Sequence, residues 1–185
     1  LDRQPRHIEC FDNSNLQGAH PVASCVVFRD GKPSRKEYRH FNIKTVTGAD
    51  DYASMREVVF RRYTRLMAEG AEMPDLIIAD GGKGQMGVIH EVLERLGLDI
   101  PIAGLAKDDR HRTAELLCGF PPVLVGIRPT SPLFHFLAHI QEEVHRFAVS
   151  FHRQKRSKTF IHSELEQIEG VGDKTVQTLL RHFRT

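Results

Sequence analysis

Residues 74–96 read PDLIIADGGKGQMGVIHEVLERL, and this stretch decides the fold class. The apolar run from Pro74 to Ala79 is short, which is typical of a buried strand, and it stops at Asp80. The closely spaced glycines after Asp80 predict a loop that leads into a helix from about Gln85 to Leu96. A buried strand followed by a helix indicates an α/β protein.

The sequence before this stretch predicts three strands and a helix. The expected elements are strands at Arg6 to Phe11, Pro21 to Phe28 and about Ser34 to Ile43, a hairpin turn at Asp30-Gly31-Lys32, and a helix from Asp50 or Asp51 to about Glu69. The sequence after it predicts strand Ile100 to Ala106, a short hairpin of Thr113 to Cys118 with Val123 to Gly126, a helix from Pro129 to about His152, and a helical unit from Phe160. This order resembles an RNase H-like fold, with a mixed five-stranded sheet flanked by helices.

Charge alone does not demand a nucleic-acid partner. The 185 residues are 27% charged, with a formal net charge of +2. Basic residues do gather locally, at Arg61-Arg62, at Arg110-His111-Arg112 and from His152 to Lys158. Such clusters can neutralise phosphates, although a solvated helix face or loop is the alternative interpretation.

The three cysteines, Cys10, Cys25 and Cys118, follow no metal-ligand spacing. The simplest interpretation is that they are reduced and that the protein is cytoplasmic. No segment approaches the run of about 20 apolar residues that a membrane span needs, and no signal peptide opens the chain. Because the chain begins at Leu1 without a methionine, we expect a fragment of a longer protein.

Two aspartates end strands of the expected sheet. Asp12 ends the first strand and Asp80 ends the strand at Pro74 to Ala79. Two carboxylates held side by side repel each other, and a bound divalent cation would relieve that repulsion. Hard oxygen ligands favour Mg²⁺ or Mn²⁺ over zinc. The alternative is that each aspartate caps the loop or helix that follows it.

A histidine on the long helix is the third candidate. His145 shares a helix face with Glu142, and in the expected fold this helix packs across the sheet near both aspartates. His145 could ligate a metal or move a proton, or it could be an ordinary surface histidine. His135 and His139 also share a face and leave a zinc hydrolase open, but no His-Glu-x-x-His pattern exists.

The loop from Asp80 to Gln85 superficially resembles a phosphate-binding loop. It lacks the Walker spacing and the Lys-Ser/Thr pair, which excludes a nucleoside-triphosphate site of that kind. Its glycines could let the backbone approach a DNA strand, with Lys83 near a phosphate, or the loop could be a purely structural turn.

The segment from Leu165 to Phe183 predicts a helix-hairpin-helix. The turn Gly170-Val171-Gly172 can expose backbone N–H groups at the start of the second helix, where they can hold a DNA phosphate without reading sequence. Lys174 adds positive charge. The alternative is a glycine-containing turn between two packed helices.

Several motifs in order resemble the UvrC family, the incision subunit of bacterial nucleotide excision repair. They are IECFD (8–12), VASCVVF (22–28), DDYASM (50–55), RRY (61–63), DGGKGQ (80–85) and IEGVG (168–172). The resemblance covers nearly the whole chain. It implies an RNase H-like endonuclease domain at residues 1–157 and a helix-hairpin-helix DNA-binding motif at residues 158–185.

The resemblance also implies function. In the UvrC family this domain cuts the damaged strand on the 5′ side of a bulky lesion, and the catalytic set falls on Asp12, Asp80 and His145, with Asp51 implicated in incision. Asp51 could equally be a helix N-cap. The implied partners are lesion-containing double-stranded DNA, UvrB and the UvrA-loaded complex, with Mg²⁺ or Mn²⁺ as cofactor and a 3′-hydroxyl and a 5′-phosphate as products.

The chain departs from the family pattern in what we do not find: a domain for the 3′ cut, a segment that binds UvrB, and a second helix-hairpin-helix. The alternative function is a catalytically inactive DNA-binding or partner-docking module, against which the presence of Asp12, Asp80 and His145 argues. The expected DNA contacts are Arg61, Arg62, Lys83, Lys107, Arg112, Arg153, Lys155, Gly170, Gly172 and Lys174.

Overall fold

A single mixed sheet organises the first part of the chain. The computed structural model describes residues 3–14, 22–107, 113–166 and 172–183. Its strands are β1 (His7–Ser14), β2 (Val22–Arg29), β3 (Lys32–Pro33), β4 (Arg39–Asn42), β5 (Leu76–Ala79), β6 (Ile102–Lys107), β7 (Thr113–Cys118) and β8 (Val123–Val125). Its helices are the 3-10 turn η1 (Arg35–Glu37), α1 (Asp51–Ala68), α2 (Lys83–Leu96), α3 (Pro132–Glu166) and α4 (Asp173–Phe183).

The chain divides into two compact units, Leu1–Ala148 and Val149–Thr185. This division lies within α3 and earlier than the predicted domain boundary after residue 157. The second unit holds the later part of α3 and α4, in which Val176 is fully buried. That residues 158–185 act as a separate DNA-binding motif stays a prediction.

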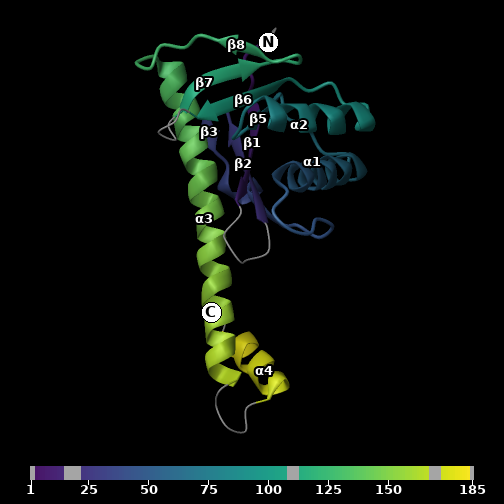
Figure 1. The fold of residues 1–185 in the computed structure, drawn as a ribbon, viewed down its shortest axis with the longest axis vertical. Coiled ribbons are helices and arrows are strands. Elements are labelled where there is room, and N and C mark those ends of the chain that lie inside the picture. The colour runs from purple at the N-terminus through teal and green to yellow at the C-terminus, as the bar shows by residue number, and fades with distance from the viewer. Residues whose placement is uncertain (1–2, 15–21, 108–112, 167–171, 184–185) are drawn as a thin grey trace. The chain divides into compact units, whose positions relative to one another are not determined.

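The strand order in the first unit is β3-β2-β1-β5-β6-β7-β8, with β4 also paired to β2. The centre is parallel, because β1 pairs with β5 and β5 with β6 in the same direction, while the outer pairs are antiparallel. Helices α1 and α2 lie on one side of this sheet, and the first part of α3 lies on the other (Figure 1). The mixed sheet between helices confirms the predicted fold class.

Strand β1 is buried on both faces, and its side chains alternate between the two helical layers. Asp12 lies opposite Ser24 of β2, on the face toward α3, where Phe28 packs edge-on against Phe136. Glu9 and Phe11 point to the other face, where Phe11 contacts Tyr63 of α1. The direction of each β1 side chain therefore decides which helix it meets.

The predicted hairpin and helix cap are both confirmed. Asp30 and Gly31 form a two-residue turn between β2 and β3, and both have positive φ values, 51° and 77°. Helix α1 begins after Asp50, whose side chain accepts a hydrogen bond from the backbone N–H of Ala53.

Three details of the prediction are wrong. The third strand is split into β3 and β4, because the turn η1 after Pro33 carries Tyr38 into the core. The two helices expected from Pro129 and Phe160 are one helix, α3, because no glycine or proline interrupts residues 133–166. The sheet has eight strands in the described residues, not five, because of that split and because β7 and β8 join it beyond β6.

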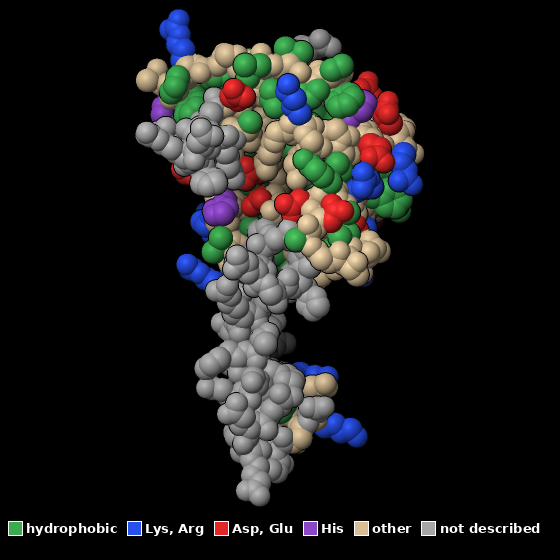
Figure 2. Space-filling view, viewed as in Figure 1, with side chains coloured by type: hydrophobic (Ala, Val, Ile, Leu, Met, Phe, Trp, Pro, Cys, Tyr) green, Lys and Arg blue, Asp and Glu red, His purple; other side chains and the backbone are tan. Residues whose placement is uncertain are grey.

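The surface of the first unit is uneven. Exposed apolar side chains gather on the edge strand β8 and its flanks, at the top of the view in Figure 2, and include Phe120, Val123 and Leu124. Acidic and basic side chains are interspersed over α1 and α2 (Figure 2). Among the described residues, no helix has the length and apolar character needed to cross a membrane.

Candidate active site

The two aspartates follow the last residue pair of the parallel β1–β5 ladder. Asp80 comes directly after β5, as predicted, whereas Asp12 does not end its strand, because β1 continues to Ser14 against β2. Phe11 of β1 and Ala79 of β5 are paired in the parallel register, and the backbone N–H of Asp80 donates to the carbonyl oxygen of Phe11 at 2.9 Å. Because parallel strands end at the same edge of a sheet, Asp12 and Asp80 follow this pair as neighbours. The structure therefore places both predicted carboxylates at one edge of the sheet.

Helix α3 brings His145 to the first aspartate. The Nδ1 atom of His145 lies 3.8 Å from Oδ2 of Asp12. The Asp12 side chain is 11% exposed, whereas that of His145 is 64% exposed. One side of the imidazole therefore faces the buried carboxylate while most of the ring stays open to solvent.

One turn earlier, the same helix reaches the second aspartate. The Nε2 atom of Gln141 donates to Oδ1 of Asp80 at 2.5 Å, and Gln141 is buried. Gln141 is not among the residues that the sequence analysis predicts for the site. The signal was its spacing four residues before His145, which places both side chains on one helical face.

The structure settles which aspartate caps α1. Asp50 is the N-cap, so Asp51 is the first helical residue, and its side chain is exposed. The backbone carbonyl of Asp51 accepts a hydrogen bond of 2.7 Å from Nδ2 of Asn13, the residue after Asp12. The N-terminal end of α1 is thereby tied to the strand end that carries the candidate site.

The glycine loop packs where side chains would not fit. Gly82 is the N-cap of α2, and Lys83 after it is exposed. A Cβ on Gly84 would meet the ring of Tyr52, with the nearest ring carbons at 2.8 Å. A Cβ on Gly104 of β6 would meet the backbone oxygen of Gly81, also at 2.8 Å. Because Gly84 and Gly104 have no side chains, the loop can pack against Tyr52 of α1 and against β6. The sequence alone does not predict this role of Gly104.

A metal centre is only partly formed by these contacts. Among the described residues, no group of three or more His, Cys, Asp or Glu side chains lies in a metal-holding arrangement. The structure brings His145 to Asp12, whereas Asp80 is held by Gln141. His139, from the alternative zinc pair, packs its ring edge against Phe28 at 5.6 Å between centroids.

A second set of polar side chains is buried on the opposite face of β1. Glu9 is fully buried, and its carboxylate accepts hydrogen bonds from Arg62 at 2.6 Å and Tyr63 at 2.9 Å, with His7 Nε2 3.3 Å away. Burial by itself would raise the pKa of the Glu9 carboxyl. The neighbouring His7 imidazole and the hydrogen bonds from Arg62 outweigh burial and hold this pKa below its usual value.

This cluster holds Arg62, one of the expected DNA contacts, inside the protein. The Arg62 side chain is 11% exposed and bound to Glu9, so a phosphate contact would require this buried ion pair to break. Its neighbour Arg61 is half-buried, pairs with Glu57 at 2.8 Å and donates to the carbonyl oxygen of Asn42.

The other expected DNA contacts divide into exposed and undescribed residues. The exposed ones are Lys83, Arg153, Gly172 and Lys174. Arg112 and Gly170 lie outside the described residues, as do the side chains of Lys107 and Lys155. The roles of all these residues in DNA binding stay predictions.

A family model described as the UvrC RNAse H endonuclease domain matches residues 1–149, which include Asp12, Asp80 and His145. The chain belongs to this UvrC family. It is 62% identical over its full length to the protein named UvrABC system protein C of Bacteroides fragilis, and 60% identical to that of Streptococcus uberis. It spans only 30% and 31% of the length of these two proteins.

Solved structures resemble this UvrC domain more distantly. Endonuclease V of Ciona intestinalis in complex with inosine-containing DNA is 14% identical, with a TM-score of 0.42, over 57% of this chain and 48% of that one. The catalytic domain of human endonuclease V is 16% identical, with a TM-score of 0.37, over 66% of this chain and 61% of that one.

Proposed function

We propose that the chain is a divalent-metal-dependent endodeoxyribonuclease that makes the 5′-side incision at bulky lesions during bacterial nucleotide excision repair. One observation carries the proposal beyond family membership: α3 brings His145 to Asp12 and Gln141 to Asp80 at a single sheet edge. The proposed substrate is double-stranded DNA with a bulky lesion, and the proposed partners are UvrB and the UvrA-loaded complex in the bacterial cytoplasm.

Asp12, Asp80 and His145 would hold Mg²⁺ or Mn²⁺. Their donor chemistry fits these ions, because two carboxylates just beyond the β1–β5 ladder offer hard oxygen ligands and the exposed imidazole can complete the set. When bound, the metal would supply an activated water and stabilise charge on the phosphodiester, leaving a 3′-hydroxyl and a 5′-phosphate.

The side chains around these ligands have separate proposed roles. His145 would either ligate the metal or handle the proton of the attacking water or leaving oxygen, because most of its ring faces solvent. Asp51 would support incision from the exposed start of α1, where its backbone carbonyl is bonded to Asn13. Gln141 would orient the Asp80 carboxylate.

A second candidate function is a catalytically inactive module that binds DNA and docks partners. The observation that favours it is the lack of a metal-holding group of three or more side chains within the described residues. Such a module would bind DNA equally well in EDTA and would not cut DNA in any divalent metal.

Nicking of supercoiled plasmid in Mn²⁺ tests the proposed function, with the wild-type chain beside Asp80→Ala. We expect nicking by the wild type, its loss in EDTA and its loss in the variant, because Asp80 supplies a metal ligand. Equal nicking by both proteins would indicate a contaminant or a wrongly assigned site. No nicking by the wild type, together with metal-independent DNA binding, would favour the inactive module.

Gln141→Ala tests the role assigned to Gln141. We expect the Mn²⁺ concentration needed for half-maximal nicking to rise roughly 10–100-fold, the usual range when a partner of a metal ligand is lost. A purely structural role would lower the melting temperature and leave the Mn²⁺ dependence unchanged. His135→Gln is the matched control, because His135 is an exposed residue of the same helix. A normal Mn²⁺ dependence in this control would also exclude His135 from the metal site.

A further inference from the structure

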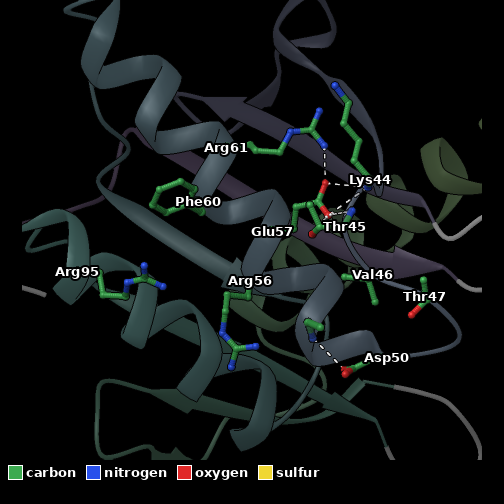
Figure 3. Close-up of a pocket in the computed structure, with 11 residues that line it drawn as sticks. Lys44, Thr45, Val46, Thr47, Asp50, Arg56, Glu57, Phe60, Arg61 and Arg95 are labelled. Carbon is green, nitrogen blue, oxygen red and sulfur yellow. Dashed lines mark hydrogen bonds and ion pairs between the residues drawn. The ribbon is translucent and has the colours of Figure 1, made fainter.

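A basic groove lies beside the candidate site, between the segment before α1 and the outer face of α1. It encloses about 610 Å³, within the range of about 300–1,000 Å³ that is typical of ligand pockets. It is lined by Lys44, Thr45, Val46, Thr47, Asp50, Ala53, Arg56, Glu57, Phe60, Arg61 and Arg95 (Figure 3). Four of these side chains are basic and two are acidic.

Both acidic side chains are occupied by the protein itself. Glu57 accepts hydrogen bonds from the backbone N–H groups of Lys44 and Thr45, from the Thr45 hydroxyl and from Arg61, at 2.7–2.9 Å for the shortest contact of each. Asp50 caps α1 through the N–H of Ala53 (Figure 3). These contacts fold residues 44–50 into one wall of the groove and leave the groove with an excess of positive charge.

The basic side chains are held differently from the acidic ones. Arg61 is bound to Glu57, and Arg56 pairs with Glu91 at 3.1 Å on the surface. Neither the ammonium of Lys44 nor the guanidinium of Arg95 forms an ion pair with any residue that the structure describes. Both side chains are exposed, so both are available to an anion from outside.

An exposed aromatic ring lies among these cations. Phe60 is 38% exposed, and the guanidinium carbon of Arg95 lies 5.7 Å from the centre of its ring. Phe60 lies between Arg61 and the pair Arg56 and Arg95 (Figure 3). An aromatic ring beside cations is how proteins bind single strands of nucleic acid, because the ring stacks a base while the cations contact phosphates.

The groove adjoins the candidate site through the start of α1. Asp50 lines the groove, and the next residue, Asp51, is bonded through its carbonyl to Asn13, which follows Asp12. A DNA strand with one phosphate at the Asp12–Asp80 edge would pass the start of α1 to enter the groove on the outer face of that helix. An acidic protein segment would explain the cations but not the position beside the candidate site.

We propose that this groove binds the DNA strand that continues from the scissile phosphate, with Lys44 and Arg95 on successive phosphates and Phe60 against a base. This inference rests on the proposed function, because it takes the Asp12–Asp80 edge as the place of cutting. The groove would hold the strand in register for incision without reading its sequence.

The first test measures DNA binding without cutting. Affinity for a fluorescein-labelled single-stranded oligonucleotide is measured by anisotropy in EDTA over a range of salt concentrations, for wild type and for Lys44→Glu/Arg95→Glu. We expect binding roughly tenfold weaker at low salt. The slope of log K against log salt concentration should become shallower by about 1.4, because each of the two lost phosphate contacts contributes about 0.7 on a single strand. The matched control is Lys32→Glu/Arg65→Glu, which reverses two exposed charges outside the groove.

The second test locates the DNA. Thr47→Cys, labelled with a photoactivatable aryl azide, should crosslink to the oligonucleotide, and the crosslink should disappear when Lys44→Glu/Arg95→Glu is added. The control is the wild type treated with the same reagent, which measures crosslinking through the native cysteines: Cys10 and Cys25 are buried, whereas Cys118 is half-buried.

Equal loss of affinity in the groove variant and the control would overturn the proposal, as would unchanged affinity with no crosslink at Thr47. The groove would then suit an acidic protein segment. The readouts also separate the two proposals: a specific crosslink without metal-dependent nicking would retain the groove and reject the nuclease. Metal-dependent nicking by the wild type, with DNA affinity unchanged in Lys44→Glu/Arg95→Glu, would retain the nuclease and reject the groove.

Discussion

Asp12→Asn should reduce nicking of plasmid DNA by at least about 1,000-fold and leave the fold intact. The amide has the shape of the carboxylate but no charge, so the site loses a hard anionic ligand. A loss of this size corresponds to about 4 kcal/mol of transition-state stabilisation, within what a bound metal contributes. The nicking rate of both proteins in saturating Mn²⁺ measures the loss of activity, and their melting temperatures show whether the fold is intact.

The control for Asp12→Asn is Asp99→Asn, which makes the same chemical change at an exposed position before β6. The control should nick at the wild-type rate. If Asp12→Asn retained the wild-type rate as well, Asp12 would not be a ligand, and its contact with His145 would have no catalytic role. A lower melting temperature with unchanged nicking would assign Asp12 a structural role only.

The parts of the fold that the sequence predicts are those set by local chemistry. The apolar run before Asp80 forms β5, the Asp30-Gly31 turn has the two positive φ values that its residues favour, and Asp50 caps α1. Placing Asp12 and Asp80 at one sheet edge needed only the order of strands. Strand, turn and cap each depend on residues that are close in sequence, whereas the meeting of Asp12 and Asp80 follows from the fold that the element order resembles.

The features that the sequence did not predict depend on contacts between distant residues. Tyr38 leaves the strand pattern because its hydroxyl donates to Glu143 of α3 at 3.0 Å. Gln141 has no local motif, and its partner Asp80 lies 61 residues earlier. Arg62 is expected from the sequence to contact DNA beside Arg61, but a buried carboxylate 53 residues earlier binds it. Only the packed structure identifies these partners.

The buried pair of Glu9 and Arg62 carries the second large expected effect. Arg62→Met should lower the free energy of unfolding at pH 7 by about 3 kcal/mol, the lower end of the range for a buried charge that loses its partner. The lower end applies because Tyr63 and His7 would still contact the carboxylate. Urea unfolding followed by circular dichroism measures this difference.

The effect should depend on pH with a definite sign. In the wild type the pKa of Glu9 is lower in the folded state than in the unfolded chain, so Glu9 contributes stability above pH 4–5 and loses it as the pH falls through the folded pKa. Without Arg62, burial should raise the folded pKa above the unfolded value. Glu9 of the variant then takes up a proton on folding as the pH falls. The difference in unfolding free energy between wild type and variant should therefore be smaller at pH 4 than at pH 7.

The decisive comparison replaces both charges. Glu9→Leu/Arg62→Met removes the carboxylate that Arg62→Met leaves unpaired, so the double variant should recover most of the lost stability, as apolar replacements of buried pairs usually do. Arg65→Met, at an exposed position on the same helix, controls for loss of a surface charge. A double variant no more stable than Arg62→Met would mean that packing of the arginine stem, not its charge, stabilises the join between β1 and α1. Because β1 also carries Asp12, recovery of stability together with wild-type nicking would show that Arg62 supports the fold and not the binding of DNA.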